Sequence, residues 1–477
     1  MERVVIVGGG VSGLALAFWL QRLASEAGRP LRVTVLEAEE TPGGKMRTER
    51  EGPYRVEWGP NGFLDSKVHA VRLVEALGMG SQVLQASLRS RTRYITRHGR
   101  PVPVPESPLA FLRSPLISVS GKIRLLGEPF APPAPPNRDE TVAEFVRRRI
   151  GPEALAWLID PMVSGVFAGD PEALSLAAVF PRMVELERDH GGLFRALWHL
   201  GREKRRSRRN PAAGGMGQPT GVLTSFREGS QSLVETLAGS LAPGTLICGA
   251  RVQQVHRSLG GSVVEFRDAQ GSIRWLPADR VVLACPSYEA ARMIRREMSD
   301  LAMLLDQIPY APISVVGTAF EARALQGSPR GFGVLHPRVE GRGSLGTLYD
   351  SLVFENRAPE GQVLLRTMVG GARDPVGAML PDEALLDRVL RDLREVLGVR
   401  GDPVRVWIFR HDRGIPQYLR GHPGLLRQVD LRVARWPGLH LCSNAYRGIA
   451  LGDCCREAET LARQVVPSDP GPRDPPA

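Results

Sequence analysis

Three glycines near the N-terminus have the spacing of a dinucleotide-binding turn. Gly8, Gly10 and Gly13 lie between the apolar segment 3–7, a predicted strand, and the segment 14–27, a predicted helix. In such a turn the first glycine allows the tight bend, the second lets the backbone approach a pyrophosphate, and the third permits close packing of helix on strand. Amide groups at a helix N-terminus attract phosphate. The spacing therefore predicts binding of an adenine dinucleotide.

An acidic residue follows at the end of the next predicted strand, residues 31–37. Glu37 can accept hydrogen bonds from both ribose hydroxyls of the dinucleotide, although a solvated acid at a strand end has the same pattern. The adjacent glycines Gly43 and Gly44 could pass under the same cofactor or form a plain turn.

The C-terminal region decides between NAD and FAD, which the glycine fingerprint alone does not separate. Residues 438–442 read as a strand, residues 443–448 as a glycine-containing loop, and residues 449–466 as the last helix. The N-terminus of that helix would stabilise negative charge on a reduced flavin. An N-terminal fingerprint closed by a C-terminal strand, loop and helix favours a large FAD protein.

Composition limits the class of protein. The chain has 477 residues, 43% of them hydrophobic, and a net charge of +11, which predicts two or three folded domains and excludes disorder of the whole chain. The positive charge suits nucleic acid, anionic lipid or acidic small molecules and does not choose among them. No signal peptide or spanning segment is predicted. Five cysteines without CxxC spacing predict no disulfide framework and no zinc site, so a reducing cytoplasm is expected.

The elements that position these residues predict an α/β fold. Residues 107–180 read as short helices separated by prolines, and residues 201–215 as a mobile, solvated basic surface loop, for which nucleic-acid binding is the alternative. Residues 245–285 read as an antiparallel meander. Further strands are predicted over residues 310–370 and 404–409, with a helix over residues 382–397. We expect no Ser/His/Asp set, carboxylate pair or metal cluster, so no catalytic or metal-binding residue is assigned.

Several narrow motifs accompany the fingerprint. They are EWGP at 57–60, GVFAGD at 165–170, GFG at 331–333, GIPQY at 414–418 with GH at 421–422, and NAYRG at 444–448 with DC at 453–454. With these strings, residues 3–465 resemble the protoporphyrinogen oxidase family, FAD enzymes of haem synthesis within the monoamine-oxidase-like superfamily.

The resemblance implies a discontinuous molecule of three domains with a disordered tail. A Rossmann-like FAD-binding domain would occupy residues 1–86, 218–296 and 436–466, a mixed-sheet substrate domain residues 87–106, 181–217 and 297–435, a helical membrane-binding domain residues 107–180, and the tail residues 467–477. Leu109, Phe111, Leu112, Leu116 and Ile117, bordered by Arg113, Lys122 and Arg124, would form the membrane-facing surface. An ordinary helical region packed on the core fits the sequence equally well.

The resemblance also assigns cofactor contacts, which are mostly backbone contacts. They fall on Gly8, Gly9, Gly10, Val11, Ser12, Gly13, Glu37, Ala38, Lys45, Gly59, Pro60, Asn61, Gly62, Val252, Ile449, Ala450 and Leu451. Two positions depart from the family pattern: Gly452 stands where relatives often have Asn, and His411 where several have Trp.

The implied substrate is a porphyrinogen, oxidised to a porphyrin by three two-electron steps in which FAD takes hydride and O2 is reduced to peroxide. Arg93 matches the propionate-binding position, where a guanidinium suits a carboxylate. Gly165, Phe332, Leu335, Leu348 and Met368 match substrate-contacting positions, although without the resemblance the four apolar residues would be assigned to the core.

Several alternatives stay open at this point. Coproporphyrinogen III, with four propionates instead of two, is the nearest competing substrate of the implied protoporphyrinogen IX. An amine-oxidase-like or carotenoid-desaturase-like enzyme shares the N-terminal fingerprint, but would not carry the VFAGD and GIPQY strings. A non-catalytic flavin-binding or haem-chaperoning protein is the third reading. The sequence also leaves open whether the chain forms a homodimer and whether it contacts the inner face of the cell membrane.

Overall fold

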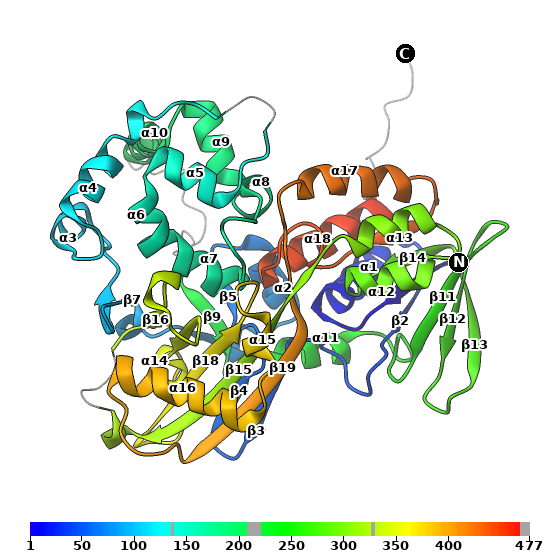
Figure 1. Cartoon of the computed structure of the whole chain (residues 1–477). Coiled ribbons are helices and arrows are strands. Elements are labelled where there is room, and N and C mark those ends of the chain that lie inside the picture. Colours follow the sequence, from blue (N-terminus) through cyan, green and yellow to red (C-terminus); the bar gives the residue numbers. More distant parts are fainter. Residues whose placement is uncertain (135–137, 208–220, 326–329, 468–477) are drawn as a thin grey trace.

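The computed structural model describes residues 1–134, 138–207, 221–325 and 330–467. The chain folds into a mixed α/β molecule with three regions, which we call the FAD region, the substrate sheet and the helical region (Figure 1). The helical region lies beside the substrate sheet, on the side away from the three-stranded sheet at the other end of the molecule.

The FAD region is built on a parallel five-stranded sheet with the order β10-β2-β1-β14-β20. Its strands are β1 (Glu2–Val7), β2 (Leu31–Leu36), β10 (Leu246–Ile247), β14 (Arg280–Leu283) and β20 (Leu439–Leu441). Its helices are α1 (Val11–Glu26), α2 (Val68–Ala76), α11 (Gln231–Ser240), α12 (Ser287–Ile294), α13 (Ser299–Asp306), α17 (His422–Val433) and α18 (Leu451–Val465). The antiparallel strands β11 (Arg251–Ser258), β12 (Gly261–Arg267) and β13 (Ile273–Ala278) extend from it.

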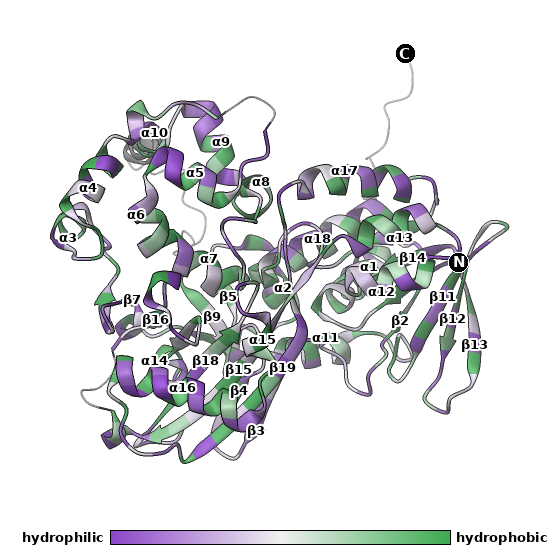
Figure 2. Cartoon of the chain, in the orientation of Figure 1, coloured by the Kyte–Doolittle hydropathy of each residue, from purple (hydrophilic) through white to green (hydrophobic). Residues whose placement is uncertain are grey.

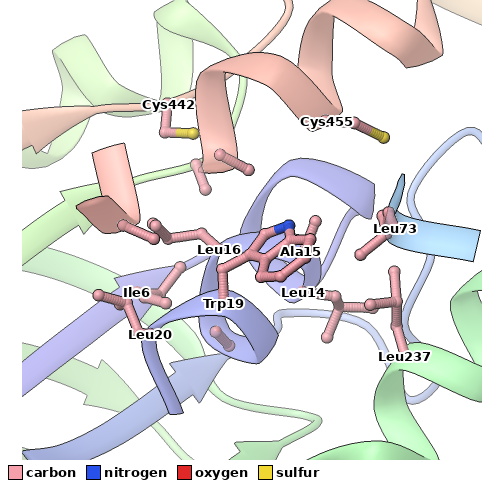
Figure 3. Close-up of a cluster of buried hydrophobic side chains, with 14 of the residues drawn as sticks. Ile6, Leu14, Ala15, Leu16, Trp19, Leu20, Leu73, Leu237, Cys442 and Cys455 are labelled. Carbon is pink, nitrogen blue, oxygen red and sulfur yellow. The ribbon is translucent and has the colours of Figure 1, made fainter. Parts of the chain in front are cut away.

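Hydrophobic burial holds the FAD region together. Strand β1 ends in four buried residues, 4–7, as expected of a central strand covered on both faces. Figure 3 shows the cluster between the sheet, α1 and α18, in which Leu16 and Leu20 are completely buried. Cys442 and Cys455 lie in the same cluster and are free thiols.

The substrate sheet has seven strands in the order β19-β15-β18-β17-β16-β7-β8. They are β7 (Arg93–Arg97), β8 (Arg100–Pro103), β15 (Tyr310–Glu321), β16 (Gly333–Leu335), β17 (Gly346–Leu348), β18 (Gln362–Gly370) and β19 (Arg405–Pro416), with α14 (Asp350–Val353), α15 (Pro375–Ala378) and α16 (Asp382–Leu397) attached. Neighbouring strands are antiparallel except β16 and β7. Leucines and valines of α16 cover one face of the sheet, which leaves the opposite face for the site.

Short strands connect the sheet to the FAD region. The hairpin of β3 (Thr48–Glu51) and β4 (Tyr54–Glu57) packs through Tyr54 and Val56 on the uncovered face of the substrate sheet. The strands β5 (Phe63–Leu64), β6 (Val83–Gln85) and β9 (Leu223–Phe226) form a small sheet next to it.

The helical region contains α3 to α10. They are α3 (Pro108–Arg113), α4 (Val119–Leu126), α5 (Val142–Arg149), α6 (Pro152–Ala154), α7 (Asp160–Phe167), α8 (Leu176–Val179), α9 (Pro181–His190) and α10 (Leu193–Ser207), with a π-helical turn at Leu155–Ile159. No helix among the described residues is long and apolar enough to cross a membrane. Hydropathy alternates along these helices, with apolar residues also on the outward side of α3 and α4 (Figure 2).

The observed packing differs from the expected domain limits in three places. Residues 181–207, expected in the substrate domain, pack in the helical region, where Glu187 bonds with Arg148 and Arg149. Helices α13 and α17, also expected there, pack on the FAD region. Residues 201–207, expected in a loop, belong to α10. Residues 208–215 of that loop and residues 468–477 of the tail lie outside the described parts of the chain.

Candidate active site

The glycine turn joins β1 to α1 as expected. Gly8 has a φ of +112°, and a Cβ there would lie 2.9 Å from the carbonyl oxygen of Ala284. A Cβ on Gly13 would overlap the carbonyl oxygen of Gly8, so only glycine lets α1 pack this closely on the strand. The space in front of Gly10 is open, and α1 has neither a side-chain cap nor an acidic residue in its first turn. Its free amides therefore suit a phosphate.

Glu37 is buried at the end of β2 with its carboxylate turned toward the glycine turn. Its Oε2 accepts a hydrogen bond from the Gly9 amide at 2.6 Å, and its Oε1 accepts one from the Glu39 amide at 2.9 Å. A carboxylate has about four acceptor positions, so two remain for ribose hydroxyls. On the other side of Glu37, its carbonyl oxygen accepts the Ala250 amide at 2.7 Å, which brings Val252 at the start of β11 close by. Ala38 is half-buried next to Glu37.

The second glycine pair lies against the first turn. The Gly43 amide donates to the carbonyl oxygen of Gly9 at 2.9 Å. Lys45 then reaches the end of β19, where its Nζ donates to the carbonyl oxygens of Arg413, at 2.6 Å, and Gly414. Burial lowers the pKa of Lys45 to about 8. Lys45 thus ties the cofactor turn to the substrate sheet.

A buried ion pair holds the loop 59–62. Arg366 on β18 donates through Nε to Asp350 Oδ2 at 2.7 Å and through a terminal nitrogen to the carbonyl oxygen of Gly59 at 2.8 Å. Both charged side chains are at most 2% exposed. Asn61 Nδ2 lies 3.5 Å from Asp350, whereas Asn61 Oδ1 is buried without a hydrogen-bond partner in the protein. An orphaned buried acceptor needs a donor, which suits a bound cofactor at this loop; Pro60 and Gly62 flank it.

The EWGP motif is anchored by the side chain of Glu57. This fully buried carboxylate accepts hydrogen bonds from the Ser230 amide at 2.8 Å, the Ser230 hydroxyl at 2.6 Å and the Thr48 hydroxyl at 2.8 Å. Burial raises the pKa of Glu57, partly opposed by Arg357 and these donors. The start of the loop is thereby fixed by the FAD region as well as by Arg366.

The cofactor positions at α18 approach the glycine turn from the other end of the chain. Helices α1 and α18 pack against each other. Burial raises the pKa of the Cys454 thiol in the first turn of α18, and Ser12 in the first turn of α1 partly opposes this rise. Helix α18 begins after Ala450 without a side-chain cap, Ile449 is half-buried, and Leu451 is buried. Residues from both ends of the chain, Val11 and Ser12 included, therefore surround one region, as the resemblance implies.

Four of the predicted substrate residues share the uncovered face of the substrate sheet. The strand register pairs Gly346 with both Leu335 and Met368, and Gly333 with both Leu348 and Arg93. Since paired residues point to the same side of a sheet, Arg93, Leu335, Leu348 and Met368 form one apolar surface with an arginine at its edge. Gly165 of α7 closes over it, because a Cβ there would lie 2.6 Å from Leu335 Cδ2.

Arg93 lines a cavity of about 320 Å³ at the edge of this surface. Its guanidinium lies over the ring of Phe332, 5.4 Å from the centroid. The cavity is also lined by Arg91 and Glu106, and by Ala86, Ser87, Leu88, Ser90 and residues 221–223. Two arginines at one opening can bind carboxylates.

Sequence reasoning missed four residues of the site: Arg91, Glu106, Asp350 and Arg366. Arg91 lies two residues before Arg93, but its backbone is helical and β7 begins only at Arg93, so the period of a strand does not predict that the two arginines line one cavity. Nothing in the sequence distinguishes Arg366 from the other arginines, because its role depends on contacts with residues more than 300 positions away. Among the described residues no cluster of three His, Cys, Asp or Glu could hold a metal ion.

Comparison with known proteins defines the class. Residues 11–466 match the model of the flavin-containing amine oxidoreductases. The chain therefore belongs to this family, and it is an FAD-dependent oxidoreductase with a mixed α/β fold, as the sequence predicted.

Relatives that match nearly the whole chain show which members of this family it resembles. The chain is 32% identical to chloroplastic protoporphyrinogen oxidase 1 of Arabidopsis thaliana, covering 97% of this chain and 87% of the relative. It is 29% identical to coproporphyrinogen III oxidase of Bacillus subtilis (strain 168), covering 98% of both chains. A crystal structure from Exiguobacterium sp. 255-15, provisionally assigned as a protoporphyrinogen oxidase, aligns with a TM-score of 0.80 and 26% identity over 98% of both chains. The resemblance seen in the motifs is confirmed.

Proposed function

We propose that this enzyme oxidises protoporphyrinogen IX to protoporphyrin IX in haem biosynthesis, with O2 as the electron acceptor. Three two-electron steps remove six electrons and six hydrogens from the substrate and convert three O2 into three H2O2. Bound FAD would accept hydride from the substrate and pass the electrons to O2. The names of the full-length relatives support oxidation of a porphyrinogen.

The observation that carries the proposal is the asymmetry of the substrate surface. Leu335, Leu348 and Met368 offer an apolar floor for a flat macrocycle, and the arginines lie at one edge, beside Phe332. Protoporphyrinogen has carboxylates on one edge only, whereas coproporphyrinogen III carries four propionates. Arg91 and Arg93 outnumber Glu106 in the cavity at this edge, so a substrate with carboxylates on one edge only, protoporphyrinogen, is favoured.

The chain's own residues bind and orient in this scheme. Arg93 would hold a propionate by charge-assisted hydrogen bonds. The apolar floor would exclude water from the macrocycle, and the loop 59–62, fixed by Arg366, would hold the cofactor against it. Positioning of this kind can supply much of the rate acceleration without a protein general base.

Parallel assays test the substrate. Purified yellow protein is given protoporphyrinogen IX or coproporphyrinogen III under air, and porphyrin fluorescence is followed. Faster turnover of protoporphyrinogen IX supports the proposal, with one H2O2 formed per O2 consumed. Preference for coproporphyrinogen III would overturn the choice of substrate, and inertness toward both would overturn porphyrinogen oxidation.

The substitution Arg93→Ala tests the charged edge. Because a carboxylate stays anchored through the reaction, KM should rise more than kcat falls, by about tenfold or more. Arg100→Ala, an exposed arginine on the neighbouring strand outside the cavity, is the matched control and should leave KM unchanged. An unchanged KM in Arg93→Ala would refute the assignment.

We also propose that the helical region docks on a membrane surface. Its outward side carries exposed apolar side chains, among them Leu109 (58% exposed), Ile123 (65%) and Phe130 (88%), together with Leu112, Val119 and Leu126. This surface differs from the one expected from the sequence, because Leu116 and Ile117 are buried in a local core and do not face outward. The basic border is partly engaged: Lys122 and Arg124 donate to backbone carbonyl oxygens. Insertion of apolar side chains therefore dominates this contact.

Vesicle sedimentation tests the docking. Wild-type protein should bind phosphatidylcholine vesicles, with little added affinity from anionic lipid. Ile123→Glu should weaken binding at least tenfold, whereas Leu431→Glu, on an equally exposed leucine of α17, should not. Equal binding by both variants would contradict the proposed surface.

A further inference from the structure

The three narrow motifs at 165–170, 414–418 and 444–448 meet in one place. Gln417, the residue after β19, donates through Nε2 to the carbonyl oxygen of Phe167 at the end of α7, at 2.9 Å. The next residue, Tyr418, accepts the Ser175 amide at its carbonyl oxygen, at 2.9 Å. The backbone after β19 is thereby fixed against the helical region, while the Tyr418 side chain extends to the loop before α18.

The Tyr418 hydroxyl closes that loop. It donates to the carbonyl oxygen of Asn444 at 2.6 Å and accepts the Gly448 amide at 3.0 Å. The side chain is 2% exposed, and its ring stacks on His422 with centroids 4.2 Å apart and an interplanar angle of 14°. Burial raises the pKa of the phenol well above its ordinary value, so the group stays protonated and can make both bonds.

The loop closed by Tyr418 leads directly to the cofactor positions. Gly448 has a φ of +106°, and two residues later Ala450 is the N-cap of α18. A bond to each end of residues 444–448 therefore fixes where Ile449 and the first amides of α18 lie. His422 supports the same loop, with Nε2 at 3.1 Å from the carbonyl oxygen of Tyr446.

We propose that Tyr418 is a positioning residue whose hydroxyl sets the loop 444–450 against the flavin and thereby the affinity for FAD and the rate of its reduction. This rests on FAD binding at the start of α18 and is independent of which porphyrinogen is the substrate.

Tyr418→Phe removes the hydroxyl and keeps the stacked ring. In the apoprotein, hydrogen exchange of the Gly448 amide should accelerate about tenfold, since its acceptor is lost. The dissociation constant for FAD should rise about five- to tenfold, the effect of about one hydrogen bond. In the holoenzyme kcat should fall while KM for protoporphyrinogen IX changes less than twofold, because the substrate surface is untouched.

Two controls separate this role from general packing. Tyr54→Phe removes the hydroxyl of another buried tyrosine, one that bonds to Gln362 at the far end of the substrate sheet, and should leave Gly448 exchange and FAD affinity unchanged. His422→Phe keeps a ring beneath Tyr418 and leaves the Tyr418 hydroxyl in place, and it removes only the bond to the carbonyl oxygen of Tyr446. Exchange of the Gly448 amide and the affinity for FAD should therefore change much less than in Tyr418→Phe.

Unchanged Gly448 exchange and FAD affinity in Tyr418→Phe would overturn the proposal, as would equal changes in His422→Phe. Because both measurements are made without porphyrinogen, they decide the role of Tyr418 even if the wild-type enzyme oxidises a different substrate.

Discussion

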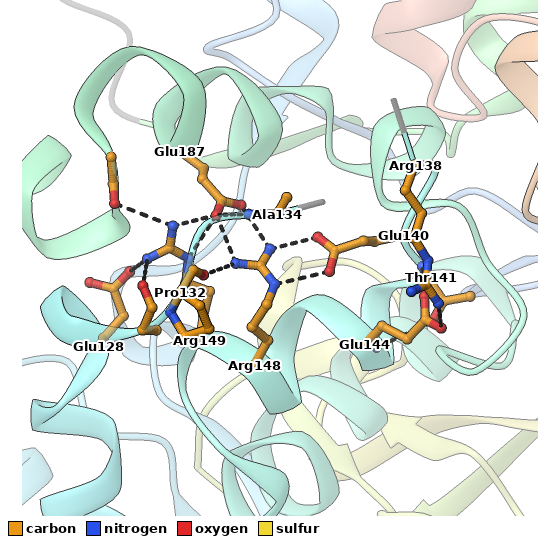
Figure 4. Close-up of polar contacts among 12 residues, drawn as sticks. Glu128, Pro132, Ala134, Arg138, Glu140, Thr141, Glu144, Arg148, Arg149 and Glu187 are labelled. Carbon is orange, nitrogen blue, oxygen red and sulfur yellow. Dashed lines mark hydrogen bonds and ion pairs between the residues drawn. The ribbon is translucent and has the colours of Figure 1, made fainter. Parts of the chain in front are cut away.

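The FAD region and the helical region are stabilised by different interactions. The FAD region has an extensive core in which α1 and α18 bury leucine, alanine and cysteine side chains against the parallel sheet (Figure 3). The helical region has a smaller apolar cluster and depends on a buried ionic network (Figure 4).

The network of the helical region joins four of its segments. Arg149 on α5 is fully buried and bonds to Glu187 on α9 and to Glu128, which is also fully buried. Glu128 in turn accepts the amides of Leu193 and Phe194 at the start of α10, at 2.8 and 3.0 Å. Arg148 joins Glu187 to Glu140. These bonds fix the relative positions of short helices that bury too little apolar surface to do so alone.

The difference matches the tasks of the two regions. A hydrophobic core tolerates changes of pH and salt, as a permanent cofactor scaffold requires. Buried ion pairs fix geometry at a desolvation cost and depend on every partner. The helical region, with apolar side chains exposed on its outer side, gains a defined shape from interactions that do not need those side chains.

The largest effect is expected for Arg149→Met, which removes the centre of the network. Glu128 and Glu187 would each lose a buried partner, and breaking a buried pair costs about 3–5 kcal/mol. Hydrogen exchange should rise throughout α5, α9 and α10 but not in β1 and α1. A uniform rise of hydrogen exchange across the chain would show that the two regions unfold together, and would contradict the view that they are stabilised separately.

Leu16→Ala tests the FAD region in the same way. Leu16 is completely buried, and such truncations cost about 2–5 kcal/mol. FAD release on heating should occur at a lower temperature, because Leu16 lies in α1, about one helical turn after Gly13 of the glycine turn. Leu431→Ala, on an exposed leucine of α17, is the control and should change stability by less than about 0.5 kcal/mol. Retention of wild-type thermal stability by Leu16→Ala would contradict this account of the core.

The pH dependence should differ in sign between the regions. Burial alone would raise the pKa of Glu187, but Arg148 and Arg149 outweigh it and hold the pKa below its ordinary value. Its stabilisation is therefore present above the unfolded pKa, near 4.3, and lost as pH falls through the folded pKa. The pKa of Glu57 is raised by burial, because the buried carboxylate has lost its hydration. Protonation of Glu57 in acid removes this desolvation cost and therefore does not destabilise the fold.

Hydrogen exchange between pH 7 and pH 3 measures this contrast. We expect α5 and α9 to lose protection at a higher pH than β4 and α11. Glu187→Gln should flatten the pH dependence of the helical region. Simultaneous loss of protection in both regions would refute the assignment.

The sequence predicted the FAD region well because its signals are local. The glycine spacing, the apolar strands and Glu37 are all read within forty residues. On the substrate sheet, the helix predicted over residues 382–397 is α16 with the same limits. The strand predicted at 404–409 extends to Pro416, because pairing with β15 continues into the GIPQY motif as far as Pro416.

The helical region could be predicted only in part, since its boundaries depend on distant partners. Nothing near residue 181 shows that α9 packs in this region; the reason is the bonding of Glu187 to two arginines about forty positions earlier. Leu116 and Ile117 look like Leu109 and Leu112 in sequence, yet the first two are buried against Ile95 and Ala154. Which apolar residues of short helices face outward is decided by tertiary packing.

The smallest effects are expected for exposed ion pairs, and they should be equal in the two regions. Arg22 and Glu26 pair on α1 at 2.9 Å, and Arg182 and Glu185 pair on α9 at 2.9 Å, with all four side chains at least 44% exposed. Water and salt screen such pairs, so Arg22→Ala and Arg182→Ala should each cost less than about 0.5 kcal/mol in urea unfolding. A markedly larger loss of unfolding free energy for Arg182→Ala would mean that charged pairs in general stabilise the helical region. Equal losses for the two variants would mean that only the buried network has this role.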